Sequence, residues 1–295
     1  MTQDLLNIIA GKMKDFSKGQ RLIGDYIVKH YEKAAFMTAS KLGNTVGVSE
    51  STVVRFASEL GYDGYPQLQK ALQEMIKNRL TTIQRMEVTN EQIGNNDVLS
   101  KVLNLDIEKI RRTLEETNTQ SFNEAVENIV NAKNIYIIGI RSAASLASFI
   151  SFYFNHIFEN VKLVNTSSTS EMFEQIFRIN KDDVMICISF PRYSKRTVSA
   201  AKFAKDCGAR IIAITDSIAS PLASVSDNLL LARSDMASFV DSLVAPLSLI
   251  NALIVAVGLK KREEISCNYA KLEKIWDEYN VYEKADDGDG YGEKM

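Results

Sequence analysis

The 295-residue sequence has few cysteines and histidines and no long, uninterrupted apolar run. Its three cysteines, Cys187, Cys207 and Cys267, are odd in number and widely spaced, which argues against a disulfide framework or a metal site and for reduced, buried thiols. The longest apolar stretch, residues 243–259, contains a proline, a serine and an asparagine and is shorter than the ~20 residues of a membrane span. The first thirty residues contain no apolar signal core. We therefore expect a soluble, cytoplasmic protein without metal or cofactor.

The chain also lacks a strong net charge, which is -2 at pH 7 and does not suggest a nonspecific polyanion binder. The charge is unevenly distributed. Residues 1–79 contain 11 Lys and Arg against 8 Asp and Glu, whereas residues 281–295 contain 2 against 5. A slightly basic N-terminal part suits a site-specific DNA-binding module. The length allows about two domains of ~150 residues each.

Residues 38–60 have the pattern of two short helices joined by a tight turn. We predict a first helix over Ala39–Val46 and a second from Ser49 to Leu60. Gly47 permits the positive φ that such a turn requires, and Ser49 is a typical residue to cap the second helix. The pattern predicts a helix-turn-helix, which places one helix in the major groove of DNA. An ordinary corner between two helices is the alternative.

The second helix of this pair has one apolar face, formed by Val53, Phe56, Ala57 and Leu60. Its other side is polar near the first turns, where recognition helices contact base edges. The predicted DNA-binding residues are Ser49, Glu50, Ser51, Thr52 and Arg55.

Further helices are expected around this pair, so that residues 1–77 form an all-α domain. Residues 78–119 are interpreted as a linker and a connecting helix. The polar segment 81–96 is the linker, and residues 98–117 form an amphipathic helix. In that helix the apolar residues near one face are Val102, Leu105, Ile110 and Leu114.

Residues 120–262 alternate short apolar runs with helix-length segments, which predicts βαβ units and a parallel sheet buried on both faces. The helix over residues 242–259 is apolar on nearly all sides, which suits burial between the sheet and a partner subunit. Residues 263–295 are interpreted as a C-terminal helix and an acidic, disordered tail. The predicted strands are Ile135–Ile140, Val161–Val164, Val184–Ile188, Arg210–Thr215 and Asn228–Leu231.

Small polar residues follow the first, third and fourth of these strands, and ligands bind at that edge of open parallel sheets. Hydroxyls and amides at helix N-termini form a natural anion site, which four cations, Arg141, Arg192, Lys195 and Arg196, would reinforce. The alternative is that these serines only cap helices. The predicted effector-binding residues are Arg141, Ser142, Ser189, Arg192, Ser194, Thr197 and Asp241.

Five motifs in the chain carry a family resemblance: VGVSESTVVRF, IYIIGIRSAA, DVMICISF, GARIIAITDS and SPLASVSDN. Residues 1 to about 77 resemble the N-terminal domain of the RpiR/MurR family of bacterial regulators, and residues from about 120 to 262 resemble its sugar-isomerase (SIS) domain. The resemblance implies a five-stranded sheet in flavodoxin-like order and self-association into a homodimer or homotetramer. It also implies a DNA-binding transcriptional regulator, a repressor by family analogy, that responds to a phosphosugar-type effector.

The sequence departs from the usual SIS pattern at two loops. Ser189 and Thr197 match the phosphate loop, but residues 190–193 lengthen it and its glycine is missing. Arg141 stands where many relatives have glycine. Two arginines beside the site favour an effector with strong negative charge, such as phosphate plus carboxylate.

The alternative function is a sugar-phosphate isomerase or another SIS-domain enzyme. Aldose–ketose isomerisation needs a base next to a carbonyl. His30 lies in the helical domain, His156 has a setting typical of a core or rim residue, and Glu171 fits the polar side of a helix. Asp241 is the other acid to consider, and it is equally suited to contacting an effector. We therefore expect a regulator and no catalysis.

Overall fold

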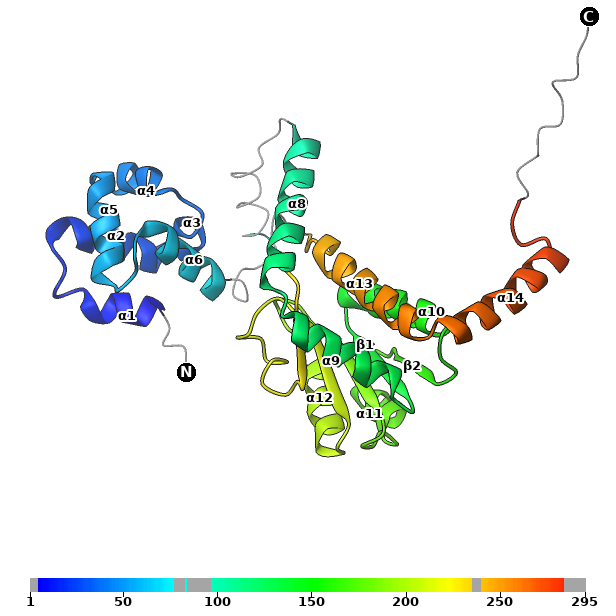
Figure 1. Cartoon of the computed structure of the whole chain (residues 1–295). Helices are drawn as coiled ribbons and strands as arrows, with labels where there is room; N and C mark the ends of the chain where they lie inside the picture. Colours follow the sequence, from blue (N-terminus) through cyan, green and yellow to red (C-terminus); the bar gives the residue numbers. More distant parts are fainter. Residues whose placement is uncertain (1–4, 77–82, 84–96, 235–239, 284–295) are drawn as a thin grey trace, which may run out of the picture.

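The computed structural model describes residues 5–76, 83, 97–234 and 240–283, and Figure 1 shows the arrangement of their helices and strands. The N-terminal part is entirely helical, as predicted, and ends before the predicted linker over residues 81–96, nearly all of which lies outside the described residues. Its helices are α1 (Leu5–Lys12), α2 (Lys18–Lys29), α3 (Tyr31–Ala34), α4 (Ala39–Val46), α5 (Glu50–Glu59) and α6 (Tyr65–Ile76).

The N-terminal helices share one apolar core, in which Phe16 and Phe56 are buried with their ring centroids 5.0 Å apart. Tyr65 is buried at the edge of this core, and its hydroxyl donates to the carbonyl of Met37 at 2.8 Å. Burial raises the pKa of the Tyr65 hydroxyl, so it remains a proton donor. Helix α5 contributes Val53, Phe56 and Ala57 to this core.

The C-terminal part is an α/β unit with a five-stranded sheet in the order β2-β1-β3-β4-β5, all neighbours being parallel. This is the flavodoxin-like order, as predicted, and each strand begins at its predicted residue. The strands are β1 (Ile135–Gly139), β2 (Val161–Val164), β3 (Val184–Ile188), β4 (Arg210–Thr215) and β5 (Asn228–Leu231). The helices are α8 (Val98–Glu116), α9 (Thr119–Val130), α10 (Ala143–Phe154), α11 (Thr169–Ile176), α12 (Lys195–Asp206), α13 (Val244–Lys260) and α14 (Arg262–Glu278).

Helices cover both faces of the sheet. Successive residues of a strand point to opposite faces, so each buried strand contributes apolar side chains to both layers. In β1, Ile137 packs into the cluster formed with α9, α10 and α13, whereas Ile138 packs against α11 and α12. Cys187 belongs to the second layer, and burial raises the pKa of its thiol, which keeps it protonated. The prediction of buried thiols is confirmed for Cys187 and is wrong for Cys267, which is exposed.

Helix α8 has the predicted extent, but the side that it buries is polar. Its buried residues are Lys109 and Thr113, whereas Ile110 and Leu114 of the predicted apolar face are exposed. An apolar stripe therefore remains uncovered along the helix. With 100° per residue, the members of this α8 stripe fall within a sector of about 80°. They are Leu99, Leu103, Ile107, Ile110 and Leu114, between 38% and 79% exposed.

Helices α13 and α14 follow one another at the C-terminal end of the described chain. The inner side of α13 is buried, including Leu249 and Leu253, while Val255 and Leu259 are exposed. Helix α14 has no buried residue and extends away from the sheet (Figure 1). No single helix among the described residues is long and apolar enough to cross a membrane; α13 and α14 meet that criterion only as a pair bent by 97°.

Candidate DNA-binding and effector sites

The turn between α4 and α5 depends on two glycines. Gly47 has φ 75°, a left-handed conformation that glycine adopts without steric cost. The amide of Val48 then donates to the carbonyl of Gly43 at 2.9 Å. A Cβ atom on Gly43 would lie 2.8 Å from the carbonyl oxygen of Val48, so the two helices approach each other too closely for a side chain there. The predicted turn is confirmed, and it fixes the direction of α5.

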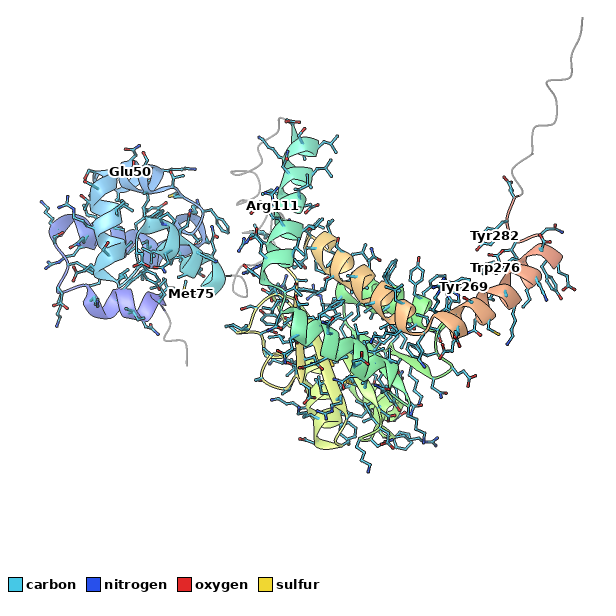
Figure 2. All side chains as sticks on the ribbon, viewed as in Figure 1. Glu50, Met75, Arg111, Tyr269, Trp276 and Tyr282 are labelled. Carbon is cyan, nitrogen blue, oxygen red and sulfur yellow. The ribbon has the colours of Figure 1, made fainter. Side chains whose placement is uncertain are left out.

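Ser49 caps α5, as predicted, by accepting a hydrogen bond from the amide of Thr52 at 3.3 Å. Its hydroxyl also lies 2.9 Å from that of Ser51 and 2.8 Å from that of Thr52. Four of the five predicted DNA-binding residues are exposed, and Figure 2 shows Glu50 at the outside of the helical part. The fifth, Thr52, is half-buried beside Gly19 of α2. The first turns of α5 therefore present hydroxyl groups and the Arg55 guanidinium to solvent.

The predicted effector residues follow strands that lie side by side. β1 and β3 are paired, with Gly139 opposite Ile188, so the loops that follow them begin at the same edge of the sheet. Arg141 and Ser142 lie in the first loop, and both are exposed. A Cβ atom on Gly139 would overlap the carbonyl oxygen of Ala143, which shows how tightly this loop turns into α10.

The second loop is organised by hydroxyl groups. The amide of Ser194 donates to the buried Ser189 hydroxyl at 3.1 Å, and the Ser194 hydroxyl accepts from the amide of Thr197 at 3.3 Å. Ser194 is therefore the cap of α12, so the simple capping interpretation holds for this serine. Thr197 is fully buried, and its Oγ1 atom has no hydrogen-bond partner among the described residues. A buried hydroxyl without a partner is costly, which suggests that a ligand or water supplies one.

The four predicted cations have different environments. The Arg196 guanidinium donates to the carbonyls of Thr166 and Ser167, at 3.3 and 2.5 Å, and so holds the loop after β2. Its role is structural, which the sequence did not predict. Arg141 and Arg192 are exposed and have positive φ, 62° and 68°. These two arginines remain the candidate anion ligands.

Tyr193 and Asp216 form a contact that sequence reasoning missed. The Tyr193 hydroxyl donates to Oδ1 of the buried Asp216 at 2.8 Å, which joins the lengthened loop after β3 to the end of β4. The only signal for it was the extra loop length, because the partner lies 23 positions away in the sequence. The contact positions Arg192, the neighbour of Tyr193, at the sheet edge.

Asp241 lies in a segment that contacts α8. The hydroxyl of Ser242 donates to Oδ1 of Asp106 at 2.7 Å, and the same oxygen accepts from Lys109 Nζ at 3.0 Å. The amide of Arg233, just after β5, donates to the Thr113 hydroxyl at 2.8 Å. We call these contacts the α8 junction. They connect α8 with the chain that leaves β5 at the same sheet edge as the effector loops.

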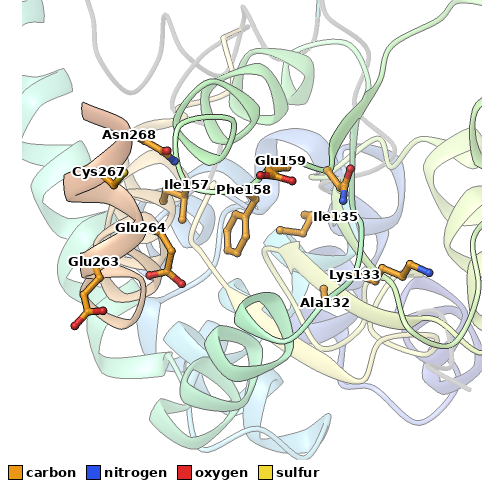
Figure 3. A pocket seen from close by; sticks show the side chains of 11 residues that line it. Ala132, Lys133, Ile135, Ile157, Phe158, Glu159, Glu263, Glu264, Cys267 and Asn268 are labelled. Atoms are coloured by element: carbon orange, nitrogen blue, oxygen red, sulfur yellow. The ribbon is translucent and has the colours of Figure 1, made fainter. Parts of the chain in front are cut away.

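A cavity of about 550 Å³ lies at the opposite edge of the sheet, beside the first residue of β1 (Figure 3). Glu263, Glu264 and Cys267 of α14 line one side of it. The pKa of Glu264 is lowered by a hydrogen bond from its own backbone and by Lys261. None of the predicted effector residues lines this cavity.

The residues weighed for isomerase chemistry are not grouped at one place. His156 contacts Tyr269 of α14, with ring centroids 5.5 Å apart, which agrees with a rim position. Glu171 is exposed in the first turn of α11 and accepts from the Thr166 hydroxyl. His30 lies between α2 and α3 in the helical part.

The helix-turn-helix is capped and exposed, and the parallel sheet is covered by helices on both faces and has a polar edge. Together these features define a transcriptional regulator with a ligand-binding domain. Two family models agree with this class: the rpiR-family helix-turn-helix domain matches residues 3–79, and the SIS domain matches residues 128–256. Together they cover more than two thirds of the chain. The chain belongs to the RpiR family of transcriptional regulators.

Two similar proteins align with most of the chain. An uncharacterised HTH-type transcriptional regulator of Caldanaerobacter subterraneus is 25% identical, over 89% of this chain and 93% of that protein. HexR, an HTH-type transcriptional regulator of Pseudomonas aeruginosa, is 22% identical over 88% of this chain and 90% of its own length.

Two solved structures share the fold. The Vibrio vulnificus NanR protein, complexed with ManNAc-6P, matches 95% of this chain and 100% of that chain, with a TM-score of 0.58 and 21% identity. The sugar isomerase domain of an RpiR transcription factor from Sphaerobacter thermophilus matches 59% of this chain and 97% of that chain, with a TM-score of 0.57 and 24% identity.

Proposed function

We propose that this regulator binds a palindromic operator through α5 and represses transcription until an anionic sugar derivative binds the polar edge of its sheet. The observation that carries the proposal is that one chain has both surfaces, the exposed side of α5 and the polar edge of the sheet. The first turns of α5 expose hydroxyl groups and Arg55, and the sheet edge carries Ser189, Thr197 and two exposed arginines. NanR, which shares the fold, was solved with a phosphosugar, and this supports the ligand class.

The proposed DNA contact is tested by Arg55→Ala. Arg55 is exposed on α5, where its Nε donates to the Ser51 carbonyl at 3.3 Å, so its loss leaves the core intact. We expect operator binding to weaken by about 1–3 kcal/mol if the guanidinium contacts a base. The measurement is a mobility shift at physiological salt on DNA from upstream of the gene.

Lys70→Ala is the matched control, because it removes the same charge from an exposed position on α6. We expect it to weaken binding less, and equally for operator and unrelated DNA. Unchanged operator affinity of folded Arg55→Ala would remove Arg55 from the proposed site.

We further propose that the α8 stripe is covered by α8 of a second copy. The stripe has the spacing of a helix–helix interface, yet in one chain the helix turns its polar side to the body. A second copy is the proposed occupant because operator recognition calls for two recognition helices. A twofold dimer presents them to half-sites about one helical turn apart, or a multiple of it.

The substitution Leu103→Glu places a charge in the centre of the α8 stripe, where Leu103 is 52% exposed in the single chain. We expect it to convert the dimer to a monomer at micromolar concentration and to weaken operator binding, because a buried unpaired charge is costly. Light scattering measures the mass. Asn104→Glu adds the same charge beside the stripe and should leave the dimer intact. A monomeric wild-type protein in the presence of operator DNA would contradict the assembly.

A further inference from the structure

Helix α5 exposes one large apolar side chain among its polar residues. Val54 is 39% exposed, although valine is among the residues that proteins bury most often. Among the described side chains of the helical part, Leu22 on α2 is the other large apolar side chain that is exposed. Single exposed apolar residues are common and need no explanation by themselves. Val54 differs from Leu22 in lying on the helix that carries the proposed DNA contact.

Val54 belongs to the outward side of α5. At about 100° per residue, it shares a sector of about 100° with three polar residues that are also exposed, Ser51, Arg55 and Ser58. The residues that α5 buries lie on the opposite side of the helix. Ser51 and Arg55 are part of the proposed DNA contact, so the methyl groups of Val54 are presented to the same surface.

Thr52 and Ser58 define the surroundings of Val54 more closely. The Thr52 methyl group lies 3.3 Å from the place that a Cβ atom on Gly19 would take, so Thr52 is turned towards α2. Val54 lies about 160° away from Thr52 around the helix. The Ser58 hydroxyl donates to the carbonyl of Val54 at 3.4 Å. An apolar group is therefore placed one helical turn from Ser51 and one turn from Ser58.

A valine in this position has one matching group in the major groove of DNA. The base edges there present hydrogen-bond donors and acceptors, and the C5-methyl of thymine is their apolar group. A β-branched side chain in a helix strongly prefers one rotamer, so the methyl groups of Val54 have a defined direction at little ordering cost. A polar base edge against these methyl groups would leave a donor or an acceptor unpaired, which is costly.

We propose that Val54 reads a thymine of each operator half-site through contact with its C5-methyl group, and so determines part of the operator sequence. The inference rests on the proposed function, in which α5 enters the major groove. Sequence reasoning missed Val54 because it assigned only polar side chains of α5 to DNA. The contact adds apolar recognition to the hydrogen bonds that Ser51 and Arg55 offer.

The test removes the contact from the DNA and from the protein in turn. Footprinting of the full chain on DNA from upstream of the gene locates the operator, and each thymine is then replaced by deoxyuridine, which lacks only the C5-methyl group. We expect one thymine in each half-site at which the replacement weakens wild-type binding by about 3- to 10-fold, the effect of burying one or two methyl groups.

Val54→Ala is expected to bind the thymine operator about 3- to 10-fold more weakly than wild type and to be insensitive to that one replacement. Its melting temperature should stay close to that of wild type, because Val54 is exposed. Leu22→Ala is the matched control, since it removes the other exposed apolar side chain from α2. It should respond to deoxyuridine as wild type does at every position.

The outcomes separate this inference from the proposed function. Specific operator binding in which no thymine replacement distinguishes wild type from Val54→Ala would overturn the reading of thymine and leave operator recognition by α5 in place. If wild type binds the upstream DNA no better than unrelated DNA, operator recognition and the inference both fail. A thymine to which wild type and Leu22→Ala respond and Val54→Ala does not would support the inference.

Discussion

The substitution Phe56→Ala is expected to remove a large part of the stability of the helical DNA-binding part and to weaken operator binding strongly. Phe56 is fully buried in α5, and its ring packs against Phe16. Removing a buried phenylalanine side chain costs about 3–5 kcal/mol. A unit of this size has a free energy of unfolding of only about 4–11 kcal/mol at about 0.05–0.15 kcal/mol per residue. The recognition helix would therefore lose the support that orients it.

Hydrogen exchange resolved along the chain measures this effect, because it reports the stability of each part separately. We expect protection to fall throughout α2 to α6 and to be retained in the sheet. Val54→Ala is the matched control on the same helix, since Val54 is 39% exposed and its truncation should change stability by no more than about 0.5 kcal/mol. Full operator affinity in Phe56→Ala would refute this account of how α5 is held.

The substitution Lys109→Met is expected to destabilise the α8 junction and uncouple the effector from DNA binding. The Lys109 and Asp106 side chains are only 7% and 15% exposed, and the ion pair spans 3.0 Å. Removing one partner of a buried pair leaves an uncompensated charge and costs about 3–5 kcal/mol. The α8 junction joins the chain after β5 to α8, the helix that follows the DNA-binding part. Without it, we expect the effector to bind but no longer to release the operator.

The double variant Asp106→Leu with Lys109→Met is the control for charge burial. It removes both charges, and replacing a buried pair by apolar side chains is often close to neutral. We expect it to recover most of the stability that Lys109→Met loses, as measured by denaturant unfolding. Effector response should stay weak, because Ser242 no longer has the Asp106 acceptor. Wild-type coupling in both variants would show that the signal does not pass through this junction.

Local signals were sufficient for the helix-turn-helix and for the strands. Gly47 and Ser49 predicted the turn because a positive φ and a helix cap depend on residues within a few positions of each other. The apolar runs predicted all five strands. The signal was strongest for β1, β3 and β4, because strands buried on both faces contain almost only apolar residues. The flavodoxin-like strand order came from the family resemblance, and the structure confirms it.

Contacts between distant segments could not be predicted in the same way. The sequence grouped Arg196 with the ligand-facing cations, but it holds the loop after β2 through backbone carbonyls 29 and 30 positions away. Tyr193 reaches Asp216 only because β3 and β4 are neighbours in the sheet. Periodicity predicted helix α8 and its amphipathic character from the sequence alone. Only the tertiary structure decided that the polar side faces the body. The backbone amide of Arg233 and the hydroxyl of Ser242 donate hydrogen bonds to that side, and the apolar stripe remains exposed.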